Sequence, residues 1–507
     1  MTTIQLFPDD SYNQKTIQQG HPPGRTNRRG GEYDLVVLGG GPAGLISAIT
    51  ARQLGRRVAM TEQRLTGGTC VNFGCTPSKA LIRCARAVHD AGRGSDFGFR
   101  LDGPPRIDFG AVMERVRRMR SMSSAGDAVQ AVEQTGAEVY LGHTRFTSPN
   151  TVEVDGAQLR FQKAVIATGA GPLIPRIDGL KDGDYLTNES VFSLTERPKK
   201  IVVIGGGPVG CELAQAFRRL GAEVDLVSHT ETLLPRDEPE AGQLIQRRLE
   251  REGVRLYLGS KAVRAVDGRL TVEGPAKSEL PYDVLLLGTG RKANIEDLGL
   301  DAANVRVGSN GIEVDEYLRT SNPNVYAAGD VAFPEKFTHA AIATARLCVA
   351  NALQSARRRA RELVVPHCTY TDPEVAQVGL TPRQAQDQKI PIDSYRLELD
   401  KVERAFIDGE EEGFAVIHTR RGSSEIVGAT LVAAHAGEMI SELTLAIAQK
   451  VPLDAVAEAI QCYPTQAEVF QRIARDYVNT RMPESGKAQV PTIRSATNIS
   501  SGSEFQS

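Results

Sequence analysis

The chain has 507 residues, and its 60 Lys and Arg nearly balance its 62 Asp and Glu, which leaves a formal net charge of −2. That balance excludes a broad basic surface for nucleic acid, and no apolar run reaches the roughly 18 residues needed to cross a membrane. At about 150 residues per domain, the length predicts three or four domains.

The two ends of the chain are polar and show little periodicity. Residues 1–31 predict an N-terminal arm or a disordered tail, and residues 481–507 predict a second disordered tail. No basic segment followed by an apolar segment opens the chain, so we predict no secretory signal. The seven cysteines are odd in number and mostly scattered singly, which is typical of a cytoplasmic protein without structural disulfides.

Between these ends, short apolar runs alternate with helical patterns, which predicts an α/β fold. Residues 35–44 read LVVLGGGPAG and residues 201–210 read IVVIGGGPVG, identical at seven of ten positions with an offset of 166. A helical pattern and a second apolar run follow each segment, so each predicts a βαβ unit.

The glycines of the two G-x-G-x-x-G turns allow a tight turn, approach of the backbone to a pyrophosphate, and close packing of helix on strand. We therefore predict two dinucleotide sites, with two unliganded turns as the alternative. The glycines are Gly39, Gly41 and Gly44 in the first turn and Gly205, Gly207 and Gly210 in the second.

The residue that ends the second strand differs between the two units. Glu62, 18 residues past Gly44, stands where an acid bonds the ribose hydroxyls of an adenosine. The offset of 166 leads from Glu62 to Ser228, so the second unit lacks that acid. A carboxylate would repel a 2′-phosphate, whereas Ser228 and His229 would not. The first site therefore suits FAD, and the second favours NADPH over NADH, with tolerance of both nucleotides as the alternative.

Three further apolar runs end in glycine or just after it, over residues 163–170, 284–291 and 324–330. Each predicts a buried strand that leads to a turn at a ligand-binding edge. Asp330 closes the last run, where it would either bond a ribityl hydroxyl or cap the following helix.

The segment GGTCVNFGCTPSKALIRCA, residues 67–85, contains the one close pair of cysteines. On a regular helix the five residues from Cys70 to Cys75 rise about 7.5 Å, beyond the usual Cα separation in a disulfide. A bond between them requires a distorted first turn, which Gly74 and Pro77 favour. Such a disulfide is readily reduced, and a helix N-terminus favours the thiolate. The pair therefore predicts redox chemistry, with two unrelated buried cysteines as the alternative.

These motifs, and G-G-T-C-x-N-x-G-C-x-P-S-K above all, resemble the flavoprotein disulfide reductases, the family of dihydrolipoamide dehydrogenase, glutathione reductase and mercuric reductase. The resemblance implies a homodimer whose active site is shared across the interface. It also implies two Rossmann-like dinucleotide-binding domains and a C-terminal α+β dimerisation domain. The implied domains are FAD-binding (32–175 and 299–355), NAD(P)H-binding (176–298) and dimerisation (356–480).

The resemblance further implies residue roles. Cys75 would be the thiolate beside the flavin, and Cys70 the outer thiol that attacks the acceptor. Lys79 would lie by flavin N5 and pair with Glu212, because a cation there stabilises an anionic reduced flavin and a carboxylate holds that cation in place. The residues expected to bind FAD are Gly39, Gly41, Gly44, Glu62, Thr69, Lys79, Gly169 and Asp330. The residues expected at the nicotinamide nucleotide are Gly205, Gly207, Gly210, Ser228, His229, Gly290 and Arg291.

The C-terminal motif departs from the family. Members that reduce disulfides carry H-P-T-x-x-E, whose His is the acid/base of thiol–disulfide interchange and comes from the partner subunit. This chain reads QCYPTQAE over residues 461–468, with Tyr463 in the His position and Glu468 retained to orient it. Because tyrosine has an unperturbed pKa of about 10 against about 6.5 for histidine, efficient reduction of lipoamide or glutathione disulfide is not expected.

A tyrosine at this position resembles the mercuric reductase branch. Yet no cysteine follows Cys462 and none precedes Cys70, so the chain lacks the metal-delivery cysteine pairs of that branch. Cys462 either reaches the active site or is a buried small residue. His367 and Cys368 have too few partners to form a metal site, so we predict no resident metal.

We therefore predict an FAD-dependent NAD(P)H oxidoreductase that passes hydride through the flavin to the Cys70–Cys75 disulfide and on to a small-molecule acceptor. The acceptor would be a metal ion, a quinone or a small disulfide. Dihydrolipoamide dehydrogenase is the alternative enzyme, and Ser228 and Tyr463 count against it. A flavin-binding redox sensor is the alternative from another class.

Overall fold

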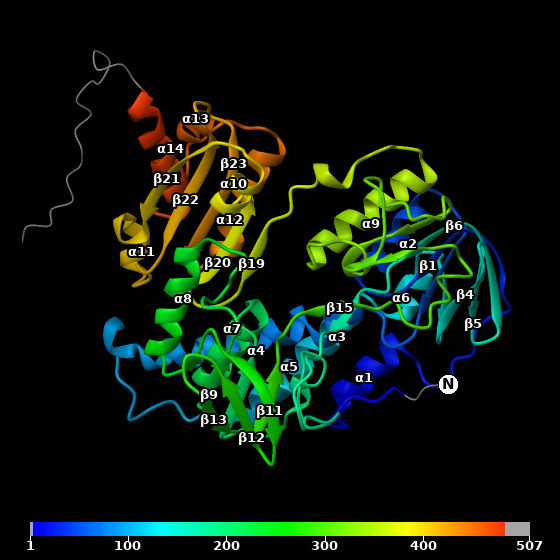
Figure 1. Cartoon of the computed structure of the whole chain (residues 1–507), viewed down its shortest axis with the longest axis horizontal. Helices are drawn as coiled ribbons and strands as arrows, with labels where there is room; N and C mark the ends of the chain where they lie inside the picture. Colours follow the sequence, from blue (N-terminus) through cyan, green and yellow to red (C-terminus); the bar gives the residue numbers. More distant parts are fainter. Residues whose placement is uncertain (1–3, 482–507) are drawn as a thin grey trace, which may run out of the picture.

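The computed structural model describes residues 4–481, which form three main β-sheets with their covering helices (Figure 1). The first sheet has the order β3 (Glu138–Leu141), β2 (Val58–Glu62), β1 (Gly31–Leu38), β6 (Ala157–Ile166), β5 (Thr151–Val154) and β4 (Thr144–Ser148). β18 (Val325–Ala327) also pairs with β6, so a segment far along the chain returns to this sheet. Helices α2 (Pro42–Gln53) and α9 (Thr338–Leu353) pack together over it.

The second sheet is parallel, and it begins with the same strand–helix–strand arrangement as the first sheet. Its order is β10 (Arg255–Tyr257), β9 (Glu223–Val227), β8 (Lys200–Ile204) and β14 (Val284–Leu287). Helix α7 (Pro208–Arg219) follows β8 as α2 follows β1, and each helix begins with a proline, whose fixed φ suits the first helical turn. Both predicted βαβ units are therefore present. Beside this sheet lies an antiparallel one, formed by β11 (Lys261–Val266), β12 (Arg269–Glu273) and β13 (Ser278–Pro281).

The third sheet is antiparallel and lies in the C-terminal part of the chain. Its order is β19 (His367–Thr369), β20 (Glu374–Gly379), β23 (Ile426–Ala433), β22 (Phe414–Arg420) and β21 (Ile392–Glu398). Helices α12 (Ala436–Ala448) and α14 (Glu468–Arg481) pack on it, and α13 (Leu453–Glu458) packs on α14. The predicted fold class, two Rossmann-like units followed by an α+β domain, is confirmed.

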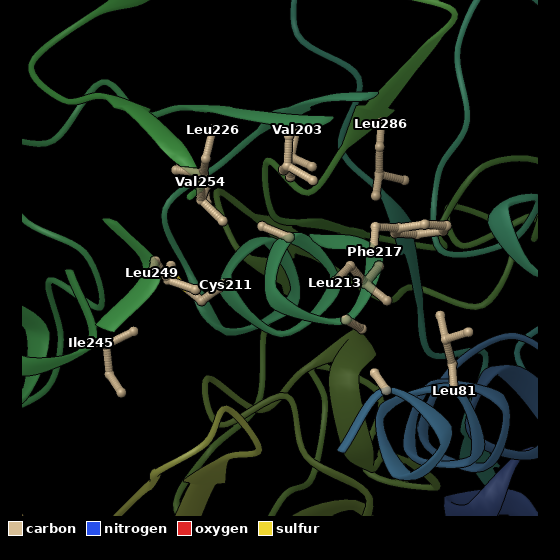
Figure 2. Packing of buried hydrophobic residues seen from close by; sticks show 14 of the residues in the cluster. Leu81, Val203, Cys211, Leu213, Phe217, Leu226, Ile245, Leu249, Val254 and Leu286 are labelled. Carbon is tan, nitrogen blue, oxygen red and sulfur yellow. The ribbon is translucent and has the colours of Figure 1, made fainter. Parts of the chain in front are cut away.

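Helix α4 (Cys75–Gly92) shares one hydrophobic core with the second βαβ unit. Leu81 of α4 lies in the same cluster as Leu213 and Phe217 of α7 (Figure 2). All three side chains are buried, and each such burial contributes about 1.5–3 kcal/mol. The helix that begins at Cys75 is thus held against the helix that carries Glu212.

The described part of the N-terminal segment is an ordered arm. Residues 11–20 form α1 (Ser11–Gly20), which packs on α5 (Phe109–Ser124) and buries Asn13 and Thr16. The disordered alternative for residues 1–31 is therefore wrong for this helix, because its polar side chains find buried partners. The tail predicted at 481–507 lies outside the described residues beyond Arg481. Over residues 4–481, no helix has both the length and the apolar character required to span a bilayer.

Candidate functional site

Cys70 and Cys75 lie on either side of a helix break. Cys70 belongs to α3 (Gly68–Phe73), and Cys75 is the first residue of α4. A Cβ on the intervening Gly74 would lie 2.9 Å from the carbonyl oxygen of Thr69, so glycine permits this close turn. The break brings the two thiols close enough that each shifts the pKa of the other, which a continuous helix would not do. Both residues are free thiols.

The two thiols differ in acidity. A hydrogen bond from the Cys70 thiol lowers the pKa of Cys75 to about 6, with further support from Thr338 and the charge of Lys79. Thr338 Oγ1 lies 3.3 Å from Cys75 Sγ. The same thiol–thiol contact, together with burial, raises the pKa of Cys70. At neutral pH the reduced pair therefore consists of a Cys75 thiolate and a neutral Cys70 thiol.

An ion pair lies one helical turn beyond Cys75. Lys79 Nζ donates to Glu212 Oε2 at 2.8 Å. Glu212 is 5% exposed, and its Oε1 accepts a hydrogen bond from the backbone N–H of Tyr370 at 2.9 Å. Lys79 Nζ also lies 4.4 Å from the centre of the Tyr370 ring, a cation–π contact. The expected pairing is present and holds a positive charge near Cys75, while its role toward a flavin stays a prediction.

Opposite charge changes in this pair should shift the Cys75 pKa in opposite directions. Lys79→Met should raise it and Glu212→Gln should lower it, because the cation favours the thiolate and the carboxylate opposes it. At pH 6, where about half of Cys75 is ionised, we expect the thiolate fraction to fall about threefold in Lys79→Met and to rise by less than about twofold in Glu212→Gln, because the charge of Glu212 has the smaller effect. The measurement is the pH dependence of Cys75 alkylation by iodoacetamide, with Lys79→Arg as the charge-conserving control. Shifts in the same direction would contradict this account.

The two glycine-rich turns have matching geometry. Gly39 and Gly205 have φ values of 108° and 127°, a region that favours glycine. A Cβ on Gly44 would lie 1.8 Å from the carbonyl oxygen of Gly39, and a Cβ on Gly210 would lie 1.8 Å from that of Gly205. The packing of the chain on itself thus requires these four glycines.

The middle glycine of each turn is not explained by such packing. A Cβ on Gly207 would meet no atom within 4 Å, and a Cβ on Gly41 would meet only the Cα of Gly68 at 3.7 Å. Each of these glycines precedes a helix whose first backbone N–H groups lack intrahelical partners. Open space at a helix N-terminus suits a pyrophosphate. The residues present therefore fit FAD at the first turn and a nicotinamide nucleotide at the second.

Glu62 and Ser228 occupy equivalent places beside these turns. A Cβ on Gly40 would lie 3.0 Å from Glu62 Oε2, and a Cβ on Gly206 would lie 2.6 Å from Ser228 Oγ. The Glu62 carboxylate accepts hydrogen bonds from the N–H groups of Gly40 and Arg64, both at 2.6 Å. The equivalence deduced from the offset of 166 thus holds in space, while the ligand of each residue stays a prediction.

Asp330 lies at the carboxyl end of β18 and does not cap the following helix. Helix α9 begins at Thr338 and its N-cap residue is Phe337, so the capping alternative is wrong. The Asp330 carboxylate instead pairs with Arg291, with 3.3 Å between Oδ2 and Nη1. Because this pair lies at the edge where β18 ends, Asp330 stays a candidate for binding a ribityl hydroxyl.

Arg291, which is expected at the nicotinamide nucleotide, has partners at the ends of two neighbouring strands, and its role toward the nucleotide stays a prediction. It begins β15 (Arg291–Ala293), which pairs with β7 (Ala170–Pro172). Its Nη2 donates to the carbonyl oxygen of Ala170 at 2.6 Å, next to Gly169, whose φ is 71°. Strand pairing therefore holds this guanidinium beside Ala170 and Asp330. Gly290, with a φ of 114°, directly precedes β15, and its carbonyl oxygen accepts a hydrogen bond from the N–H of Leu173 at 2.9 Å.

Tyr463 hydrogen bonds to neither redox cysteine among the described residues. Its side chain is 67% exposed, and its hydroxyl donates a hydrogen bond to Glu403, which raises the pKa of Tyr463. Glu468 Oε2 is buried and has no hydrogen-bond partner in residues 4–481. Glu403, rather than Glu468, therefore orients this tyrosine. Cys462 is exposed, so the alternative of a buried small residue is wrong.

Sequence reasoning missed Thr338 and Tyr370. The Thr338 hydroxyl reaches Cys75 across a separation of 263 residues, and the Tyr370 backbone N–H reaches Glu212 across 158. No local spacing pattern indicates contacts of this kind. The one nearby signal in the sequence is the pair His367 and Cys368, three and two residues before Tyr370.

The comparisons with known proteins agree with this geometry. The family model described as pyridine nucleotide-disulphide oxidoreductase matches residues 33–347, and the dimerisation-domain model of the same family matches residues 365–474. The chain belongs to this family. As a pyridine nucleotide-disulphide oxidoreductase, it is an enzyme of a class that binds FAD and uses NAD(P)H.

Relatives of this oxidoreductase fall on two branches of the family. Mercuric reductase of Streptomyces lividans is 35% identical over 459 residues, which cover 88% of this chain and 96% of the relative. Dihydrolipoyl dehydrogenase of Chlamydia muridarum is 34% identical over 468 residues, which cover 90% and 99%. The fold is shared with the HOCl-induced flavoprotein disulfide reductase RclA from Escherichia coli, at a TM-score of 0.78 and 24% identity, over 87% of this chain and 99% of RclA.

Proposed function

We propose that this oxidoreductase uses FAD and NAD(P)H to pass an electron pair through the Cys70–Cys75 disulfide to a small-molecule acceptor. The observation that carries the proposal is Cys75, a thiolate with a pKa of about 6, between the Cys70 thiol and the Lys79–Glu212 ion pair. FAD, held at the turn of Gly39, Gly41 and Gly44 beside Glu62, would supply hydride transfer from the nicotinamide nucleotide, and the Cys70–Cys75 disulfide would receive the electron pair.

The protein side chains have separate tasks in this scheme. Cys75 retains its negative charge at neutral pH, whereas Cys70, with a raised pKa, must lose a proton before it attacks an acceptor. Tyr463 is a poor base for that proton, because its own pKa is raised by Glu403. These acidities favour a thiolate-bound metal ion over small disulfides, because a metal ion takes up an electron pair without a leaving thiolate that must be protonated. A quinone would instead take its electrons directly from the flavin. The mercuric reductase relatives support a metal ion.

We further propose that the enzyme is a cytoplasmic homodimer. The dimerisation domain exposes large apolar side chains that a second copy would cover, namely Phe406, Ile407, Leu445 and Ile460. Tyr463 lies in the same domain with its ring in solvent, and in a dimer it would enter the partner's active site. The scattered free cysteines suit a reducing compartment.

The test of the acceptor is a screen of the FAD-loaded enzyme with NADPH and with NADH. Mercuric ion, a benzoquinone, lipoamide and glutathione disulfide are the probes, and the rate of nucleotide oxidation is measured with each. We expect turnover with the metal ion through the cysteine pair, and turnover with the quinone by direct electron transfer from the flavin. Fast turnover with lipoamide alone would identify a dihydrolipoamide dehydrogenase, and slow turnover with every probe would favour a redox sensor.

Nucleotide preference should depend on residue 228. Ser228 is 2% exposed, its hydroxyl lies 2.8 Å from Thr230 Oγ1, and His229 and Arg236 are exposed nearby. We expect NADPH to give the higher kcat/KM and Ser228→Glu to shift the preference toward NADH, because a carboxylate repels the 2′-phosphate. Ser228→Thr is the control that adds no charge. A native preference for NADH of tenfold, about 1.4 kcal/mol, would contradict the argument.

A further inference from the structure

The N-terminal arm, residues 10–27, lies outside the matched family models, which begin at residue 33. We propose that this arm is part of the redox site, and that Asn13, acting through Arg120, positions the α3 segment that carries Cys70. The inference rests on the proposed redox role of the cysteine pair. Asn13 and Arg120 are positioning residues, since neither touches the reacting sulfur atoms.

Arg120 connects the arm to the cysteine-bearing segment. It is 3% exposed, its Nη2 donates to Asn13 Oδ1, and its Nη1 donates to the carbonyl oxygen of Asn72 at 3.2 Å. Asn72 lies in α3, two residues after Cys70. The Asn72 side-chain amide donates to the carbonyl oxygens of Thr66 and Gly68 at 3.0 and 2.9 Å, so the guanidinium reaches the hydrogen-bond network that closes the loop before Cys70.

The arm also holds the loop that leads into α3. The N–H of Thr66 donates to the carbonyl oxygen of Gly20 at 3.1 Å, and His21 Nδ1 lies 2.6 Å from the carbonyl oxygen of Arg64. A Cβ on Gly20 would lie 3.1 Å from the Leu65 side chain, so the two segments are in direct contact. The arm therefore fixes residues 64–66 as well as Asn72.

The buried arginines of α5 require the arm. Arg117 and Arg120 are both buried, and burial together with the charge of Arg117 lowers the pKa of Arg120 to about 10. Asp10 pairs with Arg117 and also caps α1 by accepting the N–H of Asn13 at 2.8 Å. Removal of a partner from a buried charge is costly. The pairing thus ties the position of the arm to that of α5.

Cys70 and Cys75 are held by different parts of the molecule. Cys75 begins α4, whose apolar face is fixed in the core shared with α7, whereas Cys70 lies in the six-residue helix α3 that the arm and Arg120 support. Disulfide formation depends on how well the two sulfur atoms are pre-positioned. Loosening of the arm should therefore weaken the disulfide without moving Cys75.

The test measures the equilibrium between the Cys70–Cys75 disulfide and dithiothreitol in the full-length protein, with trapped thiols quantified by mass spectrometry. Reduction converts the disulfide and dithiothreitol into two protein thiols and oxidised dithiothreitol. In Asn13→Leu we expect the constant for disulfide formation to fall about tenfold, equivalent to about 30 mV for two electrons. Asn13→Asp, which keeps the acceptor oxygen, should stay within about twofold.

Arg25→Gln is the matched control. It breaks the arm's ion pair with Glu133, 2.6 Å in the native protein, away from Asn72, and should leave the constant unchanged. An unchanged constant in Asn13→Leu, or an equal fall in Arg25→Gln, would overturn the proposal, because the arm would then contribute only general stability. If circular dichroism shows Asn13→Leu to be unfolded, Arg120→Lys decides, since lysine cannot reach Asn13 and Asn72 together. The equilibrium needs no flavin turnover, so failure of the proposed enzyme function would leave this test intact.

Discussion

Cys75→Ser should abolish the long-wavelength absorption that a thiolate gives beside an oxidised flavin when the cysteine pair is reduced. Cys70→Ser should retain a thiolate at that place. Cys75 is the acidic thiol of the pair, because Cys70, Thr338 and Lys79 all favour its ionised form. Either substitution should slow metal-ion or disulfide reduction by at least about 10³-fold, since the covalent route through the sulfur atoms is lost. Quinones that take electrons directly from the flavin should still be reduced.

The pH dependence of this absorption tests the same assignment. In the native reduced protein the absorption should rise with pH through about 6, because the thiolate exists above the Cys75 pKa and is protonated below it. In Cys70→Ala the midpoint should shift upward, since the thiol that donates to Cys75 is removed and no donor replaces it. Cys84→Ser, a half-buried thiol further along α4, should behave as native. Absence of the absorption from the native protein would mean that Cys75 does not adjoin the flavin.

Tyr463→His should raise lipoamide and glutathione disulfide reduction by about 10²-fold, at the lower end of what a placed acid/base contributes. The attacking thiol must lose a proton and the leaving thiolate must gain one, and an imidazole exchanges protons near neutral pH. Glu403 bonds to the native Tyr463 hydroxyl, and the charge of Glu468 also acts on it. Both carboxylates would raise the imidazole pKa, so the gain should increase as pH rises from 6.5 to 8 and the neutral base accumulates.

The controls for this prediction separate proton transfer from packing. Tyr463→Phe removes the hydroxyl without adding a base and should give no gain with disulfides. Quinone reduction should be little affected in either variant. Rapid lipoamide turnover by the native enzyme would assign the chain to the dihydrolipoamide dehydrogenase branch. Loss of quinone reduction on substitution would instead make Tyr463 part of a site with another role.

Several features of the site follow from the sequence because they are local. Three features depend on residues that are close together in the chain. They are the two G-x-G-x-x-G turns, the strand-end positions of Glu62 and Ser228 relative to those turns, and the helix break required between Cys70 and Cys75. The backbone geometry at a glycine and the alternation of side chains along a strand are short-range properties. The spacing of residues in the sequence is therefore enough to predict them. The one long-range pairing anticipated, Lys79 with Glu212, came from the family motif rather than from any local pattern.

The tertiary structure decided the features that depend on distant partners. The polar composition of residues 1–31 predicted an arm or a disordered tail, and the ordered helix α1 depends on distant partners, namely the buried arginines of α5 and residues 64–66. Strand pairing places Arg291 beside Asp330, with which it forms an ion pair. The Tyr463 hydroxyl donates its hydrogen bond to Glu403 rather than to Glu468. Sequence by itself determined the two nucleotide turns and the redox pair, because φ, period and spacing are properties of neighbouring residues. The acidity of Cys75 was decided by the fold, because its pKa depends on Thr338 and Lys79 as well as on Cys70 across the helix break.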